Sequence, residues 1–168
     1  MKNRIFMTFL FALALVTLTV GCEKKEENNN NNNNTQPVAQ EKKLICSNSE
    51  KEDDYTEEIK YTYNFKDEKI NTVTMLSTTR YNSGKYDEKT SKKYAEDCNK
   101  ALELTKKAGF TCNVQSSGAS IWVTYQFTLA DLNEDSAKIA KENGVDEVKD
   151  KSYDELKSLF ETGGFKCQ

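Results

Sequence analysis

The spacing of apolar residues changes along this chain of 168 residues, and that change restricts the fold more than any other feature of the sequence. Residues 58–65 alternate between apolar and polar side chains, which is the pattern of a strand with one buried face. The apolar members are Ile59, Tyr61, Tyr63 and Phe65. A polar turn at residues 66–69 separates them from a β-branched run at 70–81, so the two segments predict a hairpin.

The next segment has the period of a helix. Within residues 87–108, one set of side chains recurs every three or four positions and would share a single helix face. The set is Tyr94, Cys98, Ala101, Leu102, Thr105 and Ala108. Lys106 and Lys107 fill the last turn, and Gly109 follows where a helix often has its C-terminal cap. We therefore expect one long helix that ends at Ala108.

Alternation returns after this helix. Residues 110–115 predict a strand, 116–118 a turn and 119–129 a longer strand, which together form a second hairpin. The side chains of the longer strand that would face the core are Ile121, Val123, Tyr125, Phe127 and Leu129. Its other face carries Trp122, Thr124 and Gln126, which would be exposed if helices cover only one side of the sheet. We name these three residues as a candidate binding surface.

The last part of the chain predicts two helices. The first lies near residues 134–143, and the second begins after Ser152, whose distance from Glu155 is that of a capping box. Residues 165–167 are long enough only for an edge strand. We expect an α+β domain over residues 44–168, with an antiparallel sheet of about four to five strands and helices packed on one face.

The first 22 residues have the composition of an export signal. Lys2 and Arg4 precede an apolar run at residues 5–18, and small Gly21 stands before Cys22. The segment Leu-Thr-Val-Gly-Cys at 18–22 resembles the lipobox of bacterial lipoproteins. The resemblance implies that a signal peptide of residues 1–21 is removed and that Cys22 carries the membrane lipid. An ordinary cleaved signal peptide and an uncleaved membrane anchor are the alternatives.

A polar tether is expected between the lipid and the domain. Residues 22–43 include an unbroken run of asparagines at 28–34 and the chain's single proline, Pro37. Such a composition favours a disordered linker, and about 20 flexible residues have an r.m.s. span of roughly 25 Å. We therefore expect an extracytoplasmic domain that is held to the bacterial cell membrane by lipid and raised from its surface.

Charge and composition exclude several function classes. Without Lys2 and Arg4, the chain has 22 basic and 27 acidic residues, a formal net charge of −5, which disfavours nucleic-acid binding. The chain has no histidine, so acid–base chemistry would depend on carboxylates, lysine or tyrosine. The acidic segments 50–54 and 131–135 lack the residue order of a calcium loop and are interpreted as solvated. We assign no catalytic residue, cofactor or metal site.

Four cysteines lie in the domain, an even number in a chain that is expected to be exported. The helix from Cys98 to its end rises about 15 Å, and a strand returns over that distance in about four or five residues. This favours a disulfide between Cys98 and Cys112, which leaves Cys46 to pair with Cys167. Spacings of 52, 14 and 55 residues do not fit a zinc site or a Cys-x-x-Cys redox pair. Free or partly paired thiols are the other alternative.

The order of these features resembles the YehR-like family of small bacterial lipoproteins, a domain of unknown function. The features that carry the resemblance are the lipobox, the tether, the strand Ile59-Lys60-Tyr61-Thr62-Tyr63, the helix that ends at Ala108-Gly109, and Gly163-Gly164-Phe165-Lys166. The resemblance implies an α+β lipoprotein domain and supplies no catalytic residue. We expect a non-catalytic binding module whose partner is an envelope protein, peptide or wall component. A small envelope enzyme and a structural spacer are the alternatives.

Overall fold

A computed structural model describes residues 41–168. The predicted signal peptide, the lipidation site Cys22 and the predicted tether as far as residue 40 lie outside the described residues. The first strand begins at Glu41, so the last three residues assigned to the tether belong to the sheet, and the folded domain starts earlier than the predicted Leu44.

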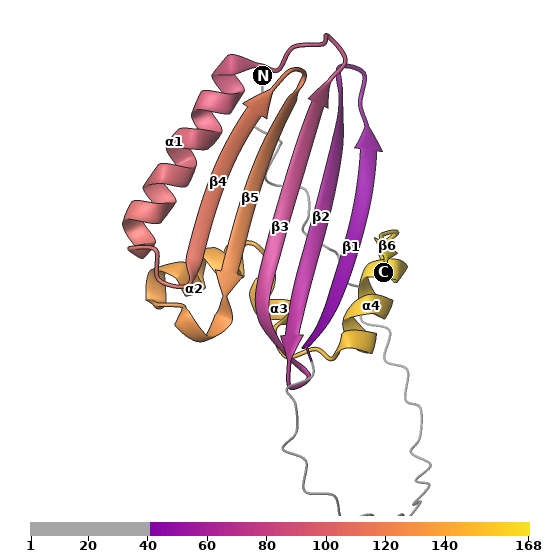
Figure 1. Cartoon of the computed structure of the whole chain (residues 1–168), viewed down its shortest axis with the longest axis vertical. Helices are drawn as coiled ribbons and strands as arrows, with labels where there is room; N and C mark the ends of the chain where they lie inside the picture. The colour runs from indigo at the N-terminus through magenta and orange to yellow at the C-terminus, as the bar shows by residue number, and fades with distance from the viewer. Residues whose placement is uncertain (1–40) are drawn as a thin grey trace, which may run out of the picture. The chain divides into compact units, whose positions relative to one another are not determined.

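An antiparallel sheet forms the centre of the described domain (Figure 1). Its six strands are β1 (Glu41–Lys51), β2 (Tyr55–Lys66), β3 (Lys69–Tyr81), β4 (Phe110–Ser117), β5 (Ser120–Thr128) and β6 (Lys166–Cys167). They are arranged in the order β4-β5-β3-β2-β1-β6, and every neighbouring pair is antiparallel. The fold class is α+β as expected, but the sheet has six strands where four to five were predicted. The strand without a sequence signal is β1.

The first predicted hairpin is formed by β2 and β3. Asp67 and Glu68 connect the strands and have φ values of 51° and 64°, the left-handed conformations that match a tight hairpin turn to the twist of a sheet. A bulge follows, because Asn64 pairs with Thr72 whereas Phe65 pairs with Ile70. The extra residue lets Ile70 and Val73 face the core together although they are three positions apart.

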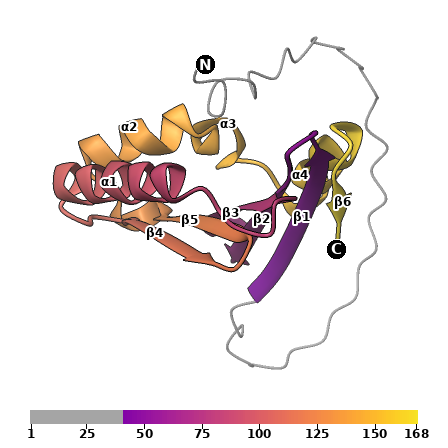
Figure 2. The same ribbon diagram turned by 90° about the horizontal axis from the view of Figure 1, so that it is seen from above.

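Four α-helices complete the domain: α1 (Glu88–Thr105), α2 (Glu134–Glu142), α3 (Val145–Val148) and α4 (Tyr153–Thr162). A short 3-10 helix, η1 (Leu129–Asp131), leads from β5 towards α2. Figure 2 shows α1, α2 and α3 on one side of the sheet. Rings of α4 contact Tyr61, Tyr63 and Phe65 of β2, so α4 covers that same side near β1. Within residues 41–168, none of the helices has both the length and the apolar composition needed to span a bilayer.

Helix α1 ends three residues earlier than the sequence predicts. Lys106 has a φ of 52° and forms the left-handed C-terminal cap that was assigned to Gly109. Gly109 is needed for a different reason: at its φ of 61°, a Cβ would lie 2.7 Å from backbone atoms of Asp131 and Leu132. The glycine therefore allows the start of β4 to pass close to the backbone that follows β5.

The helix-side face of the sheet is organised in rows that cross the strands. Facing residues on β1, β2, β3, β5 and β4 form what we call the aromatic row: Leu44, Tyr63, Val73, Phe127 and Phe110. Each of these side chains is at most 2 % exposed. Buried side chains from the helices, among them Ala140, Val148 and Leu156, complete the core against this end of the face. Burial of these apolar groups is the main stabilising contribution to the domain.

Candidate functional surfaces

The next row of the helix-side face has a cysteine at each end. It comprises Cys46, Tyr61, Met75, Tyr125 and Cys112, and we call it the cysteine row. Cys46 is bonded to Cys167 of β6 with their Cα atoms 4.1 Å apart, and Cys112 is bonded to Cys98 of α1 at 5.5 Å. These are the two pairs that the sequence favoured. The bonds therefore fix β6 to β1 near one edge of the sheet and α1 to β4 at the other edge.

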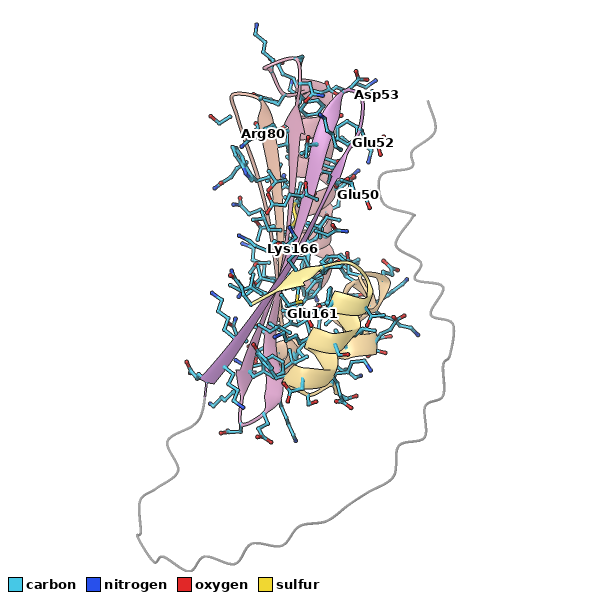
Figure 3. The ribbon with its side chains drawn as sticks, turned by 90° about the vertical axis from the view of Figure 1, so that its right-hand side faces the viewer. Glu50, Glu52, Asp53, Arg80, Glu161 and Lys166 are labelled. Carbon is cyan, nitrogen blue, oxygen red and sulfur yellow. A yellow bond between two sulfur atoms is a disulfide. The ribbon has the colours of Figure 1, made fainter. Side chains whose placement is uncertain are left out.

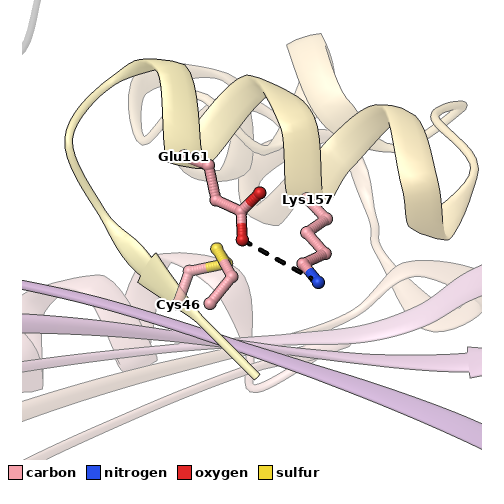
Figure 4. The surroundings of a disulfide bond; sticks show 4 residues. Cys46, Lys157 and Glu161 are labelled. Atoms are coloured by element: carbon pink, nitrogen blue, oxygen red, sulfur yellow. Dashed lines mark ion pairs between the residues drawn. A yellow bond between two sulfur atoms is a disulfide. The ribbon is translucent and has the colours of Figure 1, made fainter.

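The surroundings of the Cys46–Cys167 bond are structural in character. Figure 4 shows the disulfide beneath α4, near an ion pair in which Lys157 Nζ lies 3.8 Å from Glu161 Oε1. Both of these charged side chains are more than 40 % exposed, and an exposed ion pair contributes little to stability. Cys46 itself is fully buried. The bond thus closes the core at this edge, and reagents in solution have little access to the Cys46 sulfur.

The other face of the sheet, which we call the open face, is not covered by any of the four helices. Trp122 lies there on β5, between Thr78 of β3 and Gln115 of β4. Trp122 and Thr124 are half-buried and Gln126 is exposed, so the predicted surface of three residues does share one face. The indole is less exposed than its place on a polar face suggested, because neighbouring side chains on three strands surround it.

Threonine is the main residue type of the open face. The positions on β2, β3, β4 and β5 are Thr56, Thr62, Thr72, Thr74, Thr78, Thr111, Thr124 and Thr128. Asn64 donates a 2.7 Å hydrogen bond from Nδ2 to Thr72 Oγ1, which links β2 and β3 across this face. The remaining hydroxyl and amide groups can donate and accept hydrogen bonds, and Trp122 supplies an apolar plane beside them.

The far end of the helix-side face is polar, in contrast to the aromatic row. Glu50 of β1 lies directly opposite Glu57 of β2, and the same row continues through Thr79, Ile121 and Ser116. We call it the glutamate row. Like charges opposite each other on neighbouring strands are destabilising. The ion pairs found within residues 41–168 involve other residues, so no lysine or arginine there neutralises these two carboxylates.

Glu57 is the half-buried member of this pair. Ser77 donates a hydrogen bond from Oγ to Glu57 Oε1 at 3.1 Å. Burial raises the pKa of the Glu57 carboxyl, the Ser77 hydrogen bond opposes the rise, and the charges of Glu50 and Glu52 add to it. The carboxylate is therefore held where it is poorly solvated and close to other negative charges.

Three tyrosines lie near this carboxylate. The rings of Tyr55 and Tyr81 lie 6.3 Å apart at the ends of β2 and β3, and Tyr94 reaches the same region from α1. Burial, followed by the nearby Tyr81, Glu57, Tyr125 and Tyr55, raises the pKa of the Tyr94 phenol to about 12. We call Tyr55, Glu57, Tyr81 and Tyr94 the tyrosine–glutamate cluster. Phenols in this arrangement stay protonated at neutral pH and leave Glu57 as the only charged member.

The sequence did not identify this cluster. The alternation of residues 59–65 extends back to Glu57 and places it on the core side, which is the signal that was present. Tyr94 was assigned to the core stripe of its helix. Among the described residues, no group of three or more cysteine, aspartate or glutamate side chains is arranged to hold a metal ion. The acidic residues near the cluster are thus a region of negative charge.

Comparison with known proteins identifies the fold alone. No protein-family model matches the chain, and the search of curated proteins finds no significant match. An NMR structure of a protein from Streptococcus pneumoniae TIGR4 is similar, with a TM-score of 0.59 and 11 % sequence identity. The similarity covers 90 % of this chain and 99 % of that one. At this identity the likeness concerns the arrangement of helices and strands and carries no activity with it.

Proposed function

We propose that this protein is a lipid-anchored, non-catalytic binding module of the bacterial cell envelope, and that it holds an envelope component on the open face around Trp122. The observation that carries the proposal is the open face itself. Helices cover the opposite side of the sheet, whereas this side presents threonine hydroxyls and side-chain amides around a single indole. A module that served only as a spacer would not need such a surface.

The two disulfides support the extracytoplasmic part of the proposal. Disulfides persist in oxidising compartments, and Cys46, Cys98, Cys112 and Cys167 all take part in bonds. Cys22 is then the one cysteine without a role in the domain, which agrees with a separate role as the lipid attachment site. Labelled palmitate should enter the wild-type chain and not a Cys22→Ser variant. Equal labelling of both chains would refute lipidation at this residue.

The binding surface is tested with the protein in its own membrane. We expect Trp122→Ala to reduce the amount of an envelope component that is chemically crosslinked to the chain, because the indole is the largest apolar side chain on the open face. Leu104→Ala is the matched control, since Leu104 is a large apolar residue on α1 that is 55 % exposed. An unchanged crosslinking pattern for Trp122→Ala would favour the structural spacer.

A further inference from the structure

The outer edge of β1 is only partly occupied. β6 pairs with β1 at Cys46 and Ser47, and Ile45 exchanges two backbone hydrogen bonds of 2.9 Å with Gln168. Outward-facing backbone groups alternate along an antiparallel strand, so those of Ser49 and Lys51 point away from the sheet as those of Ile45 do. Within residues 41–168, no strand pairs with β1 on this side beyond Ser47.

The structure shows why β6 does not continue along this edge. Phe165 precedes β6, and its backbone N–H donates to the Phe160 carbonyl of α4. The Phe165 ring is buried against Phe160 and Tyr61, so the chain turns into the core instead of following β1. The outward backbone N–H of Ser49 meanwhile donates a 2.8 Å hydrogen bond to the side-chain oxygen of its neighbour Asn48. A local side-chain bond of this kind can be exchanged for a bond to an added strand.

Negative charge is concentrated beside this free edge. Residues 50–58 contain six carboxylates and one lysine, whereas β6 and the rest of β1 carry lysines. Figure 3 shows Glu50, Glu52 and Asp53 beside the upper part of β1, above β6 and on the same side of the sheet as α4. Arg80 projects from the opposite side of the sheet in the same view. The nearest basic side chain on β3 therefore does not neutralise the acidic group.

We propose that the free edge of β1 at residues 49–51 pairs with an extended basic peptide, whose alternate cationic side chains lie against Glu50 and the tyrosine–glutamate cluster. The occupant is chosen by charge complementarity. A side chain directly opposite Glu50 on an added strand would have its Cβ about 4.5–5.5 Å from the Glu50 Cβ and would point to the helix-side face. A lysine or arginine there neutralises a row in which two carboxylates oppose each other.

The tyrosines strengthen this preference for a cation. Aromatic faces attract ammonium and guanidinium groups, and the attraction grows when water is excluded. Tyr55 and Tyr81 lie one row beyond the glutamate row, at the ends of β2 and β3 nearest the β1–β2 loop, and Tyr55 is the nearer of the two to β1. Strand addition supplies backbone hydrogen bonds, and the side chains of alternate residues supply specificity. The peptide positions opposite Ser49 point to the open face and are best filled by uncharged residues such as threonine.

The probe for the test is a synthetic peptide of ten residues with alternating lysine and threonine. Its affinity is measured by isothermal titration calorimetry against the mature chain, purified in detergent with both disulfides intact. A glutamate–threonine peptide of equal length tests the charge. Spermine tests whether free positive charge suffices without a peptide backbone. A lysine–threonine peptide that is N-methylated at each threonine lacks the N–H groups that would pair with β1.

We expect the lysine–threonine peptide to bind, and each of the three comparison probes to bind at least tenfold more weakly. Replacing both carboxylates of the opposed pair, Glu50→Gln with Glu57→Gln, should weaken binding about tenfold or more. The control replaces exposed glutamates on α1 and α2, Glu103→Gln with Glu142→Gln, and should change affinity less than twofold. Ser49→Pro removes an outward N–H without removing a bond to β2, and should also weaken binding about tenfold.

Several results would overturn the proposal. Equal binding of spermine or of the N-methylated peptide would show that no strand is added. Equal binding by the Glu50→Gln, Glu57→Gln chain would show that the acidic row is not the contact surface. The N-methylated peptide keeps the test decisive even if Ser49→Pro does not fold, because it changes the ligand and leaves the protein as it is. Failure of the lysine–threonine peptide to bind leaves the proposed open-face function around Trp122 unaffected.

Discussion

The two ends of the helix-side face are built from the same five strands but have opposite properties. At one end, the aromatic row is closed by helices, and its five side chains are almost fully buried. At the other end, the glutamate row places two carboxylates opposite each other beneath half-buried tyrosines. The first end supplies stability, whereas the second end contains an arrangement that stability alone does not favour. Such a division is typical of domains that hold a binding site at one end of a packed core.

The largest change in stability should come from loss of the Cys46–Cys167 disulfide, which lies beside the aromatic row at the closed end of the face. The Cys46→Ser, Cys167→Ser chain loses a bond between residues 121 positions apart, for which chain entropy gives about 4.7 kcal/mol. The Cys98→Ser, Cys112→Ser chain loses a bond between residues only 14 positions apart, which closes a shorter loop, and should lose about 3 kcal/mol. Urea denaturation of both variants measures the difference. A larger loss for the second variant would mean that docking α1 matters more than fixing β6.

The aromatic row itself should be nearly as sensitive. Phe127→Ala removes a fully buried ring that lies in the row between Val73 and Phe110, and we expect a loss of about 3–5 kcal/mol because the surrounding side chains cannot fill the space. Thr79→Ala in the glutamate row is the matched change at the other end and should cost about 1 kcal/mol. Both free energies of unfolding come from the same urea titration. Equal losses would show that the two ends are packed alike.

A smaller difference between the two ends should appear at alkaline pH. Burial raises the pKa of the Tyr63 phenol in the aromatic row far above its ordinary value of 10.0. In the unfolded chain the Tyr63 phenol ionises from pH 10, whereas in the folded chain it stays protonated. The stability that comes from this pKa difference is complete below pH 10 and is lost as pH rises further. At pH 11 the loss from Tyr63 is about 1.4 kcal/mol. The thermal midpoint of Tyr63→Phe should therefore fall less than that of wild type between pH 10 and pH 11. An equal fall in the two chains would contradict this prediction.

Much of the closed end could be predicted from the sequence. The two hairpins and the capping box that joins Ser152 to Glu155 follow from alternation and local spacing, and both are present. Strand β1 could not be predicted, because its apolar residues Leu44, Ile45 and Cys46 are consecutive and the rest of it is polar. Pairing along the whole of β2 and the bond from Cys46 to β6 hold it in the sheet. These are contacts between distant parts of the chain.

The same limit explains why the polar end was missed. Alternation places Glu57 on the core side, but the repulsion between its carboxylate and that of Glu50 arises only once β1 pairs with β2 in this register. Likewise, the position of Tyr94 on α1 indicates a core residue, and its place near Glu57 depends on how α1 lies across the sheet. The C-terminal end of α1 was predicted wrongly for a local reason: Lys106 takes a left-handed conformation that sequence propensity assigns to glycine.

The smallest effect that we expect is a gain in stability, and it tests the polar end most directly. Burial raises the pKa of Glu57 above its ordinary value of 4.5, so the folded state favours the protonated carboxyl and is weakened when Glu57 is charged. The stability that protonation brings is complete below pH 4.5 and is lost as pH rises through the folded pKa. Glu57→Gln should therefore stabilise the domain at pH 7. The gain should be at most about 1 kcal/mol, because the half-buried Glu57 side chain keeps part of its hydration in the folded state.

The pH profile separates this effect from a general change in packing. Glutamine can still accept the hydrogen bond from Ser77, so the gain over wild type should shrink towards zero as pH falls to about 4. Glu58→Gln is the control, because Glu58 is the next residue, is exposed and lies on the open face. Its thermal midpoint should differ little from wild type at any pH. A Glu57→Gln chain that is less stable at pH 7 would mean that the carboxylate stabilises the fold, and the contrast between the two ends of the face would then fail.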